Sequence, residues 1–166
     1  MDNNDILRRL RFTLNLSDDA MIDIYAKGGE PVSRAEISNW LKKEEDEDFD
    51  VVVDENLAVF LNGLIVNHRG KKDGKIPVAE TELDNTIILR KLKIAFNFTS
   101  KELLYIWKKA DVVISETELS AFFRKRTHPK FKYLNDQYLR KFLKGFQIQR
   151  KNQRHKEMLR SLPPKK

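Results

Sequence analysis

Apolar residues recur every three or four positions across residues 1–70, the spacing of one face of an α-helix. The pattern predicts four helices. Each begins at a residue able to cap it, and these are Asn4, Ser17, Ser33 and Asp54. Ser33 and Glu36 have the spacing of a capping box. Glycines are expected to end the second helix, at Gly28 and Gly29, and the fourth, at Gly70.

The same pattern returns in the second half of the chain at a constant offset in residue number, without any insertion. The residues that reappear include Phe49, Asp54, Leu57, Phe60, Leu61 and Gly63, which return as Phe131, Asp136, Leu139, Phe142, Leu143 and Gly145. Helices of the second copy are expected over 85–97, 99–109, 115–126 and from 136 onward, with capping boxes at Thr99/Glu102 and Ser115/Glu118. The sequence therefore predicts an all-α fold of two tandem four-helix repeats related by pseudo-twofold symmetry.

The repeat sets the expected domain boundaries. An acidic helical repeat occupies residues 1–69, and a basic one occupies residues 84–152. Between them, residues 70–83 contain two glycines, a proline and several lysines with no sustained apolar period, as is typical of a linker. Residues 153–166 form a basic C-terminal tail.

The two copies of the fourth helix differ in their polar positions. In the first copy, Ala58, Val59 and Val66 widen the apolar stripe around most of the helix, which predicts a central helix covered on several sides. The second copy carries lysines and arginines opposite its stripe, which predicts a surface helix. Gly63 and Gly145 lie inside these helices, where glycine is unfavourable. They indicate either a close helix crossing or descent from one ancestral glycine.

Charge is divided unevenly between the two halves. Residues 1–75 carry 11 Lys/Arg and 16 Asp/Glu, net −5, whereas residues 76–166 carry 21 and 9, net +12, within a total of +7. The loop after the third helix shows the change most clearly. Residues 42–50 hold two positive and six negative side chains, and residues 124–132 hold five positive and none negative.

A basic loop and a basic helix face predict a phosphate-binding surface, because lysine and arginine neutralise phosphates and release counterions. We therefore expect a non-catalytic module that binds RNA or DNA, or associates with ribonucleoprotein. Aromatic rings at Tyr133 and Tyr138 are expected to stack on bases. The candidate binding residues are Arg124, Lys125, Arg126, Lys130, Lys132, Tyr138, Arg140, Lys141, Lys144 and Lys151.

Other interpretations of these features stay open. The oppositely charged loops and the apolar fourth helix also suit a protein-interaction or self-assembly module, with the loops facing each other within the chain or in a dimer. Helices two and three have a rough helix-turn-helix cadence, with Ser33–Lys43 or Ser115–Lys125 as the recognition helix. The acidic run at 44–50 lacks the alternating ligands of a calcium loop. A solvated charged surface is the plainest alternative for either loop.

Motifs of catalysis and of cofactor or metal binding are absent from the sequence. It contains no H-E-x-x-H, G-x-S-x-G or P-loop pattern, and His68, His128 and His155 are scattered. Without cysteine there is no disulfide, which is compatible with a cytoplasmic location. The longest apolar stretch is too short to span a membrane. We expect no catalytic or metal site and no cofactor, although a cleft between the repeats could hold a small ligand.

Several segments resemble the YehS-like family of small bacterial proteins. They are Asn4–Arg8, Trp40–Glu44, Phe60–Ile65 with Arg69 and Gly70 and, in the second copy, Leu89–Phe96. The resemblance covers both repeats up to about residue 151. It implies two copies of one helical domain of unknown function in a bacterial cytosolic protein, and it brings no catalytic residues that could be transferred.

Overall fold

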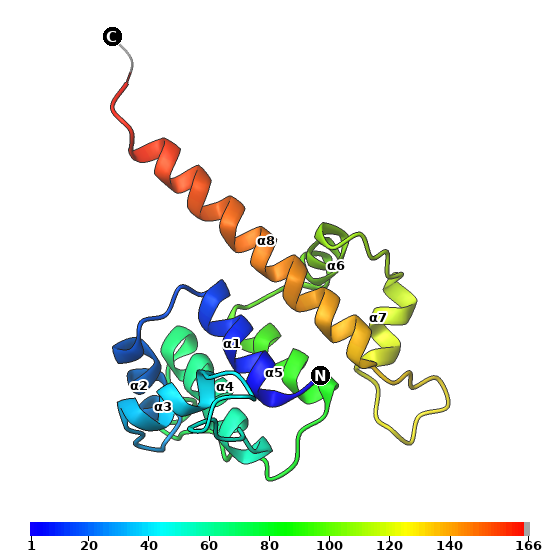
Figure 1. Cartoon of the computed structure of the whole chain (residues 1–166). Helices are drawn as coiled ribbons and strands as arrows, with labels where there is room; N and C mark the ends of the chain where they lie inside the picture. The colour runs from blue at the N-terminus through cyan, green and yellow to red at the C-terminus, as the bar shows by residue number, and fades with distance from the viewer. Residues whose placement is uncertain (165–166) are drawn as a thin grey trace.

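The structure is a computed structural model that describes residues 1–164, and within that range it contains eight α-helices and no strand (Figure 1). The helices are α1 (Asn3–Thr13), α2 (Asp18–Lys27), α3 (Arg34–Leu41), α4 (Asp54–Arg69), α5 (Asn85–Ala95), α6 (Ser100–Lys109), α7 (Glu116–Phe122) and α8 (Asp136–Ser161). Each of the first four helices begins at the position equivalent to the start of its counterpart among the last four. The predicted all-α architecture of two tandem four-helix repeats is confirmed.

Most helix boundaries follow the capping residues that the sequence indicates. The Ser17 side chain accepts from the Ala20 amide at the start of α2, and Gly28 ends this helix, followed by Gly29 at φ 100°. Complete capping boxes begin α3, between Ser33 and Glu36, and α6, between Thr99 and Glu102. These helix ends are therefore fixed by local sequence, as predicted.

Two predicted caps and one capping box are wrong. Asp2, not Asn4, caps α1, because Asn4 is buried and its side chain bonds to backbone groups at the end of α3 and in the segment that follows. Val53 precedes α4 without a side-chain cap, and the Asp54 carboxylate accepts hydrogen bonds from Asn3 and Leu83 instead. At α7, Ser115 accepts from the Glu118 amide, but the Glu118 carboxylate pairs with Lys132 instead of the Ser115 amide. The capping box therefore has only one of its two hydrogen bonds.

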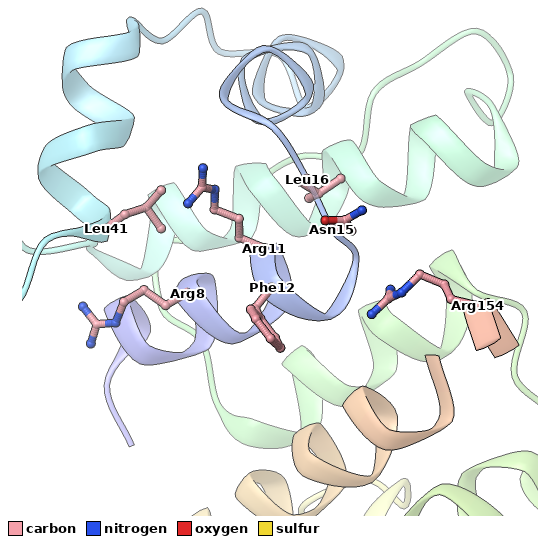
Figure 2. Close-up of a pocket in the computed structure, with 7 residues that line it drawn as sticks. All are labelled: Arg8, Arg11, Phe12, Asn15, Leu16, Leu41 and Arg154. Carbon is pink, nitrogen blue, oxygen red and sulfur yellow. The ribbon is translucent and has the colours of Figure 1, made fainter. Parts of the chain in front are cut away.

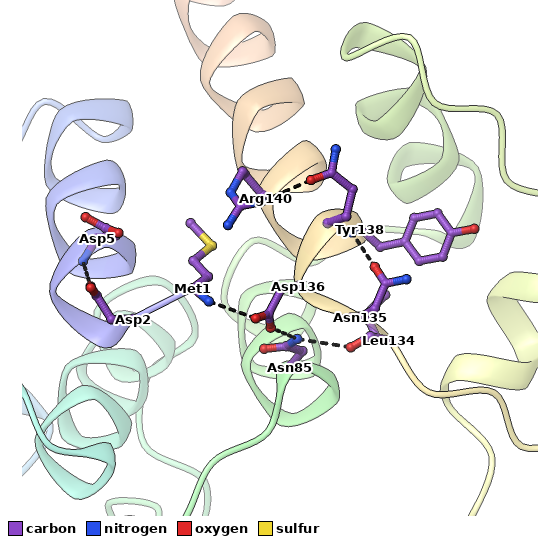
Figure 3. A network of polar contacts seen from close by, with 10 residues as sticks. Met1, Asp2, Asp5, Asn85, Leu134, Asn135, Asp136, Tyr138 and Arg140 are labelled. Carbon is purple, nitrogen blue, oxygen red and sulfur yellow. Dashed lines mark hydrogen bonds and ion pairs between the residues drawn. The ribbon is translucent and has the colours of Figure 1, made fainter.

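The aspartates that begin the two long helices join the repeats to each other. Asp54 Oδ1 accepts from Asn3 Nδ2 at 2.7 Å, and Asp136 Oδ1 accepts from Asn85 Nδ2 at 2.8 Å. The second oxygen of each carboxylate binds a segment outside its own repeat: Asp54 accepts from the Leu83 amide at the end of the linker, and Asp136 accepts from the Met1 ammonium. Figure 3 shows the network of Asp136. Since Met1 and Leu83 are also equivalent positions of the two repeats, the same pseudo-twofold axis relates the two networks.

The repeats share one hydrophobic core rather than two. Helix α4 packs on α2 of its own repeat and on α5 of the other, while α8 packs on α6 and on α1. Leu57 to Leu64 are all buried, so α4 is the central helix that the sequence predicted. Trp107 is fully buried against Phe122 and Phe142, as expected for a core residue.

Close helix crossings explain the two interior glycines. A Cβ atom on Gly63 would lie 1.9 Å from the carbonyl oxygen of Ile24 in α2, and a Cβ on Gly145 would lie 1.9 Å from that of Ile106 in α6. Neither position can hold a side chain without moving a neighbouring helix. The predicted close crossing is thus present in both repeats.

Helix α8 departs from its twin at its C-terminal end. Helix α4 stops before Gly70, which has φ 76°, whereas the equivalent Asn152 lies inside α8. Residues 153–161 of the predicted tail are therefore helical, and the last turns of α8 extend beyond the other helices (Figure 1).

Candidate nucleic-acid interface

The five cations of the basic loop lie on the surface between α7 and α8. Arg124, Lys125, Arg126, Lys130 and Lys132 are all exposed. Two of them have acidic partners: Arg126 pairs with Asp84, next to α5, and Lys132 Nζ lies 2.7 Å from Glu118 Oε2. The Lys132 pair raises the lysine pKa and lowers the pKa of Glu118, mainly through this hydrogen bond. Three of the five cations are thus left without an ion pair within residues 1–164.

Tyr138 is not free to stack on a base. Its ring packs 5.6 Å from the ring of Phe122, and the Lys132 ammonium lies 5.6 Å from its centre. The backbone carbonyl of Tyr138 accepts from the Trp107 indole at 2.9 Å. The residue joins α8 to α6 and α7, while the neighbouring Tyr133, 55% exposed, presents its ring to solvent.

The cations of α8 gather on its outer face. Arg140, Lys144 and Lys151 are exposed, and at 3.6 residues per turn they lie within about 40° of one another around the helix. Lys141 is half-buried beside them. These four predicted residues are therefore brought together on one side of α8, opposite the buried Leu139, Phe142, Leu143 and Phe146.

Acidic neighbours are scarce along this helix. Of the eight lysines and arginines in α8, none forms an ion pair with any acid in the described part of the chain. In the first repeat, by contrast, Arg8, Arg11, Lys27, Arg34 and Lys42 are all paired with aspartates. The positive charge of α8 is thus left open to solvent and to a ligand.

Helix α1 adds arginines to the same side of the molecule, which the sequence did not indicate. A hollow of about 560 Å³ lies where α1 meets α8 and α3 (Figure 2). Its lining residues are Arg8, Arg11, Phe12, Asn15, Leu16, Leu41 and Arg154. A second hollow of about 580 Å³ lies along α1 and is lined by Asp5, Arg8, Arg9, Phe12 and Gln147. The α1–α8 groove, as we call these two hollows, is basic along its length.

Each arginine of the first hollow is held by one or two contacts and keeps further N–H groups. Arg154 Nη1 donates to the carbonyl of Thr13 at 2.8 Å, which ties α8 to the end of α1. Arg8 Nη1 donates to the Lys42 carbonyl at 3.0 Å and its Nη2 pairs with Asp5, and Arg11 Nη2 lies 3.1 Å from Asp18 Oδ1. These contacts orient the guanidinium groups, and a guanidinium offers five donors in all.

Arg150 lies on the inner side of α8, facing the end of α5. Burial lowers the pKa of its guanidinium below the ordinary value, and the neighbouring Arg154 lowers it further. Its guanidinium carbon lies 6.0 Å from the centre of the Phe96 ring. The Arg150 guanidinium is thus partly desolvated beside a second arginine of the same helix.

The acidic loop lies apart from the basic loop. Figure 1 shows α3 and α7, with the segments that follow them, on opposite sides of the molecule. Lys42 Nζ lies 3.4 Å from Asp48, and within residues 1–164 no ion pair joins the 44–50 segment to the 124–132 segment. The hypothesis that the two loops face each other within one chain is wrong. Nowhere in the described range do three histidine or acidic side chains converge as metal ligands.

The helix-turn-helix interpretation finds little support in the side chains of α3. Arg34, at the start of this helix, pairs with Asp18 and Asp19 of α2, and Lys42 pairs with Asp48. We expected Arg34, Asn39 and Lys42 to reach a DNA groove, and Arg34 and Lys42 are thus occupied by aspartates. The second copy, α7, has only seven residues and carries two glutamates in its first turn.

A further hollow of about 670 Å³ lies between the repeats, where α4, α5 and the linker meet. Lys91 lines it, with its Nζ 2.6 Å from Asn62 Oδ1 and 2.9 Å from Glu80 Oε1. Ile65, Ile87 and Ile94 supply much of the remaining wall. A small ligand has room there, but this buried cation is already bound by its neighbours.

Two matches to one family cover most of the chain. The family model described as a protein of unknown function (DUF1456) matches residues 3–70 and again residues 85–152. The uncharacterised protein YehS of Escherichia coli strain K12 is 38% identical over 147 residues, which span 87% of this chain and 94% of that relative. No solved structure matches the chain. Across residues 1–164, none of the helices has the length and apolar character needed to cross a membrane.

Proposed function

Because the chain belongs to the DUF1456 family, its function has to be argued from its own surface, and we propose a non-catalytic nucleic-acid-binding module. It acts in the bacterial cytoplasm, on RNA or DNA or as part of a ribonucleoprotein. The observation that carries this proposal is the absence of acidic partners for all eight cations of α8 within the described chain.

The physical reason is the release of counterions. Each lysine or arginine that neutralises a phosphate displaces a condensed cation, so the observed affinity falls steeply as salt is added. A stripe of exposed Arg140, Lys144 and Lys151 follows one side of α8, and the loop cations Arg124, Lys125 and Lys130 extend the charge. Contacts of this kind bind the backbone and read little sequence.

Fluorescence anisotropy with labelled RNA and DNA oligonucleotides tests the proposal. Between 50 and about 200 mM salt the affinity should fall by roughly 10- to 1,000-fold for several phosphate contacts. A variant carrying Arg140→Glu, Lys144→Glu and Lys151→Glu should bind more weakly and show a shallower salt slope. Lys43→Glu, which reverses an exposed lysine beside the acidic loop, is the matched control and should change little. Failure to retain any nucleic acid at low salt refutes the proposal.

Self-association is the second candidate, and the projecting end of α8 favours it. Met158, Leu159 and Leu162 are each more than half exposed there, beside Arg154, Lys156 and Arg160. Val51 and Val53, about 60% exposed, directly follow the acidic loop. These two surfaces have complementary charge, so a second copy of the chain could join them head to tail. Leu57 to Leu64 of α4 do not contribute, because they are buried within the chain.

Light scattering at low and high salt distinguishes the two candidates. Self-association through these surfaces predicts a mass that rises with protein concentration and returns to the monomer in Leu159→Ser or at high salt. A monomer under every condition excludes this candidate and leaves nucleic-acid binding untouched.

A further inference from the structure

Phe12 has an unusual position for a phenylalanine in this chain. It is 67% exposed, whereas the other nine phenylalanines are buried or half-buried. Phe12 lies on α1 and lines both hollows of the α1–α8 groove. The ring thus stands at the boundary between the two hollows, with its surface open to solvent.

Cations flank this ring on both sides. Figure 2 shows Phe12 between Arg8, from its own helix, and Arg154, which reaches across from α8. Arg11 completes the first hollow, and Arg9 lines the second together with Gln147. Gln147 lies on α8 about two turns after Arg140 and about one turn before Lys151. The outer face of α8, which carries these two cations, therefore borders the groove.

An exposed aromatic ring between guanidinium groups suits one class of ligand. In a single strand, unpaired bases can turn a face toward an aromatic side chain while the phosphates on either side meet cations. A duplex offers phosphates but keeps its base faces stacked inside the helix.

We propose that the α1–α8 groove binds single-stranded nucleic acid, with one base stacked on Phe12 and the adjacent phosphates held by Arg9 and Arg154. This inference rests on the proposed function and makes it specific. It selects a single strand over a duplex, and it places the stacking contact in the acidic repeat. The cations of α8 then guide the strand along the helix on the far side of the groove.

The test compares a labelled single strand with the duplex of the same sequence at 50 mM salt. Phe12→Ala should weaken single-strand binding by roughly 5- to 150-fold, as loss of one stacked base does, and leave duplex binding within about twofold. The variant should fold normally because the side chain is mostly exposed. Ile94→Ala is the matched control, since Ile94 is the pseudo-twofold equivalent of Phe12 and is 45% exposed; its binding should match the wild type.

Phe12→Trp provides a direct readout of stacking. This variant should retain single-strand binding, and its exposed indole should be quenched as the strand is added. Trp40 and Trp107 contribute little to such quenching, because they are 5% and 0% exposed. Salt-sensitive binding that is equal for single strand and duplex, or that is unchanged in Phe12→Ala, overturns the inference and leaves the proposed function in place. No binding to either form overturns both.

Discussion

Replacing the interior glycines with alanine tests whether the two helix crossings are as close as the structure has them. Gly63→Ala would place a Cβ 1.9 Å from the carbonyl oxygen of Ile24 and 2.8 Å from its carbonyl carbon. An ordinary contact needs at least 3.4 Å, so α2 and α4 would have to separate by about 1.5 Å. Because the obstructing atoms are backbone, no change of rotamer can relieve the clash.

Two effects of opposite sign set the size of the change. Alanine inside a helix is favoured over glycine by about 0.5–1 kcal/mol. Overpacking usually costs about 1–3 kcal/mol, and a clash between helix backbones belongs at the upper end. The net loss in the free energy of unfolding should therefore be about 2 kcal/mol, equivalent to about 4–8 °C in Tm for a chain of this size.

Urea unfolding followed by circular dichroism, together with a thermal melt, measures this loss. Ala26→Gly, at an exposed position of α2, calibrates the helix-propensity effect and should cost about 0.5–1 kcal/mol. Gly145→Ala should behave like Gly63→Ala, because its Cβ would lie 1.9 Å from the Ile106 carbonyl oxygen. If either glycine variant is as stable as the wild type or more stable, the close crossings are wrong.

Three further variants test other parts of the fold. Asn4→Ala removes hydrogen bonds to the Trp40 and Asp50 carbonyls and from the Val52 amide, and should cost about 2–4 kcal/mol in urea unfolding and expose the 44–50 loop to limited proteolysis. Exposed Asn67→Ala should leave both readouts unchanged. Lys91→Ala leaves Glu80 and Asn62 without their shared partner and should lower the free energy of unfolding by about 2–3 kcal/mol, measured in the same way. The hydrogen bond from Asn85, and then the Met1 ammonium, lower the pKa of Asp136 below its ordinary 3.8, so this carboxylate stabilises the fold above about pH 4 and loses its contribution as pH falls through the folded-state pKa. Asp136→Asn should therefore reduce the difference between urea midpoints at pH 6 and pH 3, and exposed Asp111→Asn should leave that difference unchanged.

The sequence predicted the fold well because helices and their ends are encoded locally. Capping residues such as Ser17, Ser33 and Thr99 act within one turn, and the internal repeat shows the same elements twice. The wrong caps share one cause. Asn4 and Asp54 are residue types that cap helices, but tertiary partners from other segments take up their side chains instead. Local spacing cannot reveal a partner that belongs to a distant segment of the chain.

The candidate site was harder to predict because charge was counted along the chain. By net charge, the whole interface falls in the second repeat. Arg8, Arg9, Arg11 and Phe12 were left out because they belong to the half with net charge −5. These residues join the site only because α1 packs on α8. One signal was present: Phe12 interrupts the polar side of α1 with a large apolar ring, which a solvent-facing helix surface does not require.

The first hollow of the groove depends on one difference between the repeats. Gly70 ends α4, and its equivalent, Asn152, lets α8 continue to Ser161. Only through this extra length does Arg154 reach the Thr13 carbonyl and the hollow beside Phe12. The equivalent of Arg154 in the first repeat, Lys72, lies in the linker instead, and Ile94 takes the place of Phe12. Symmetry therefore explains how the two repeats fold together, whereas the departure from symmetry produces the surface on which we expect a ligand to bind.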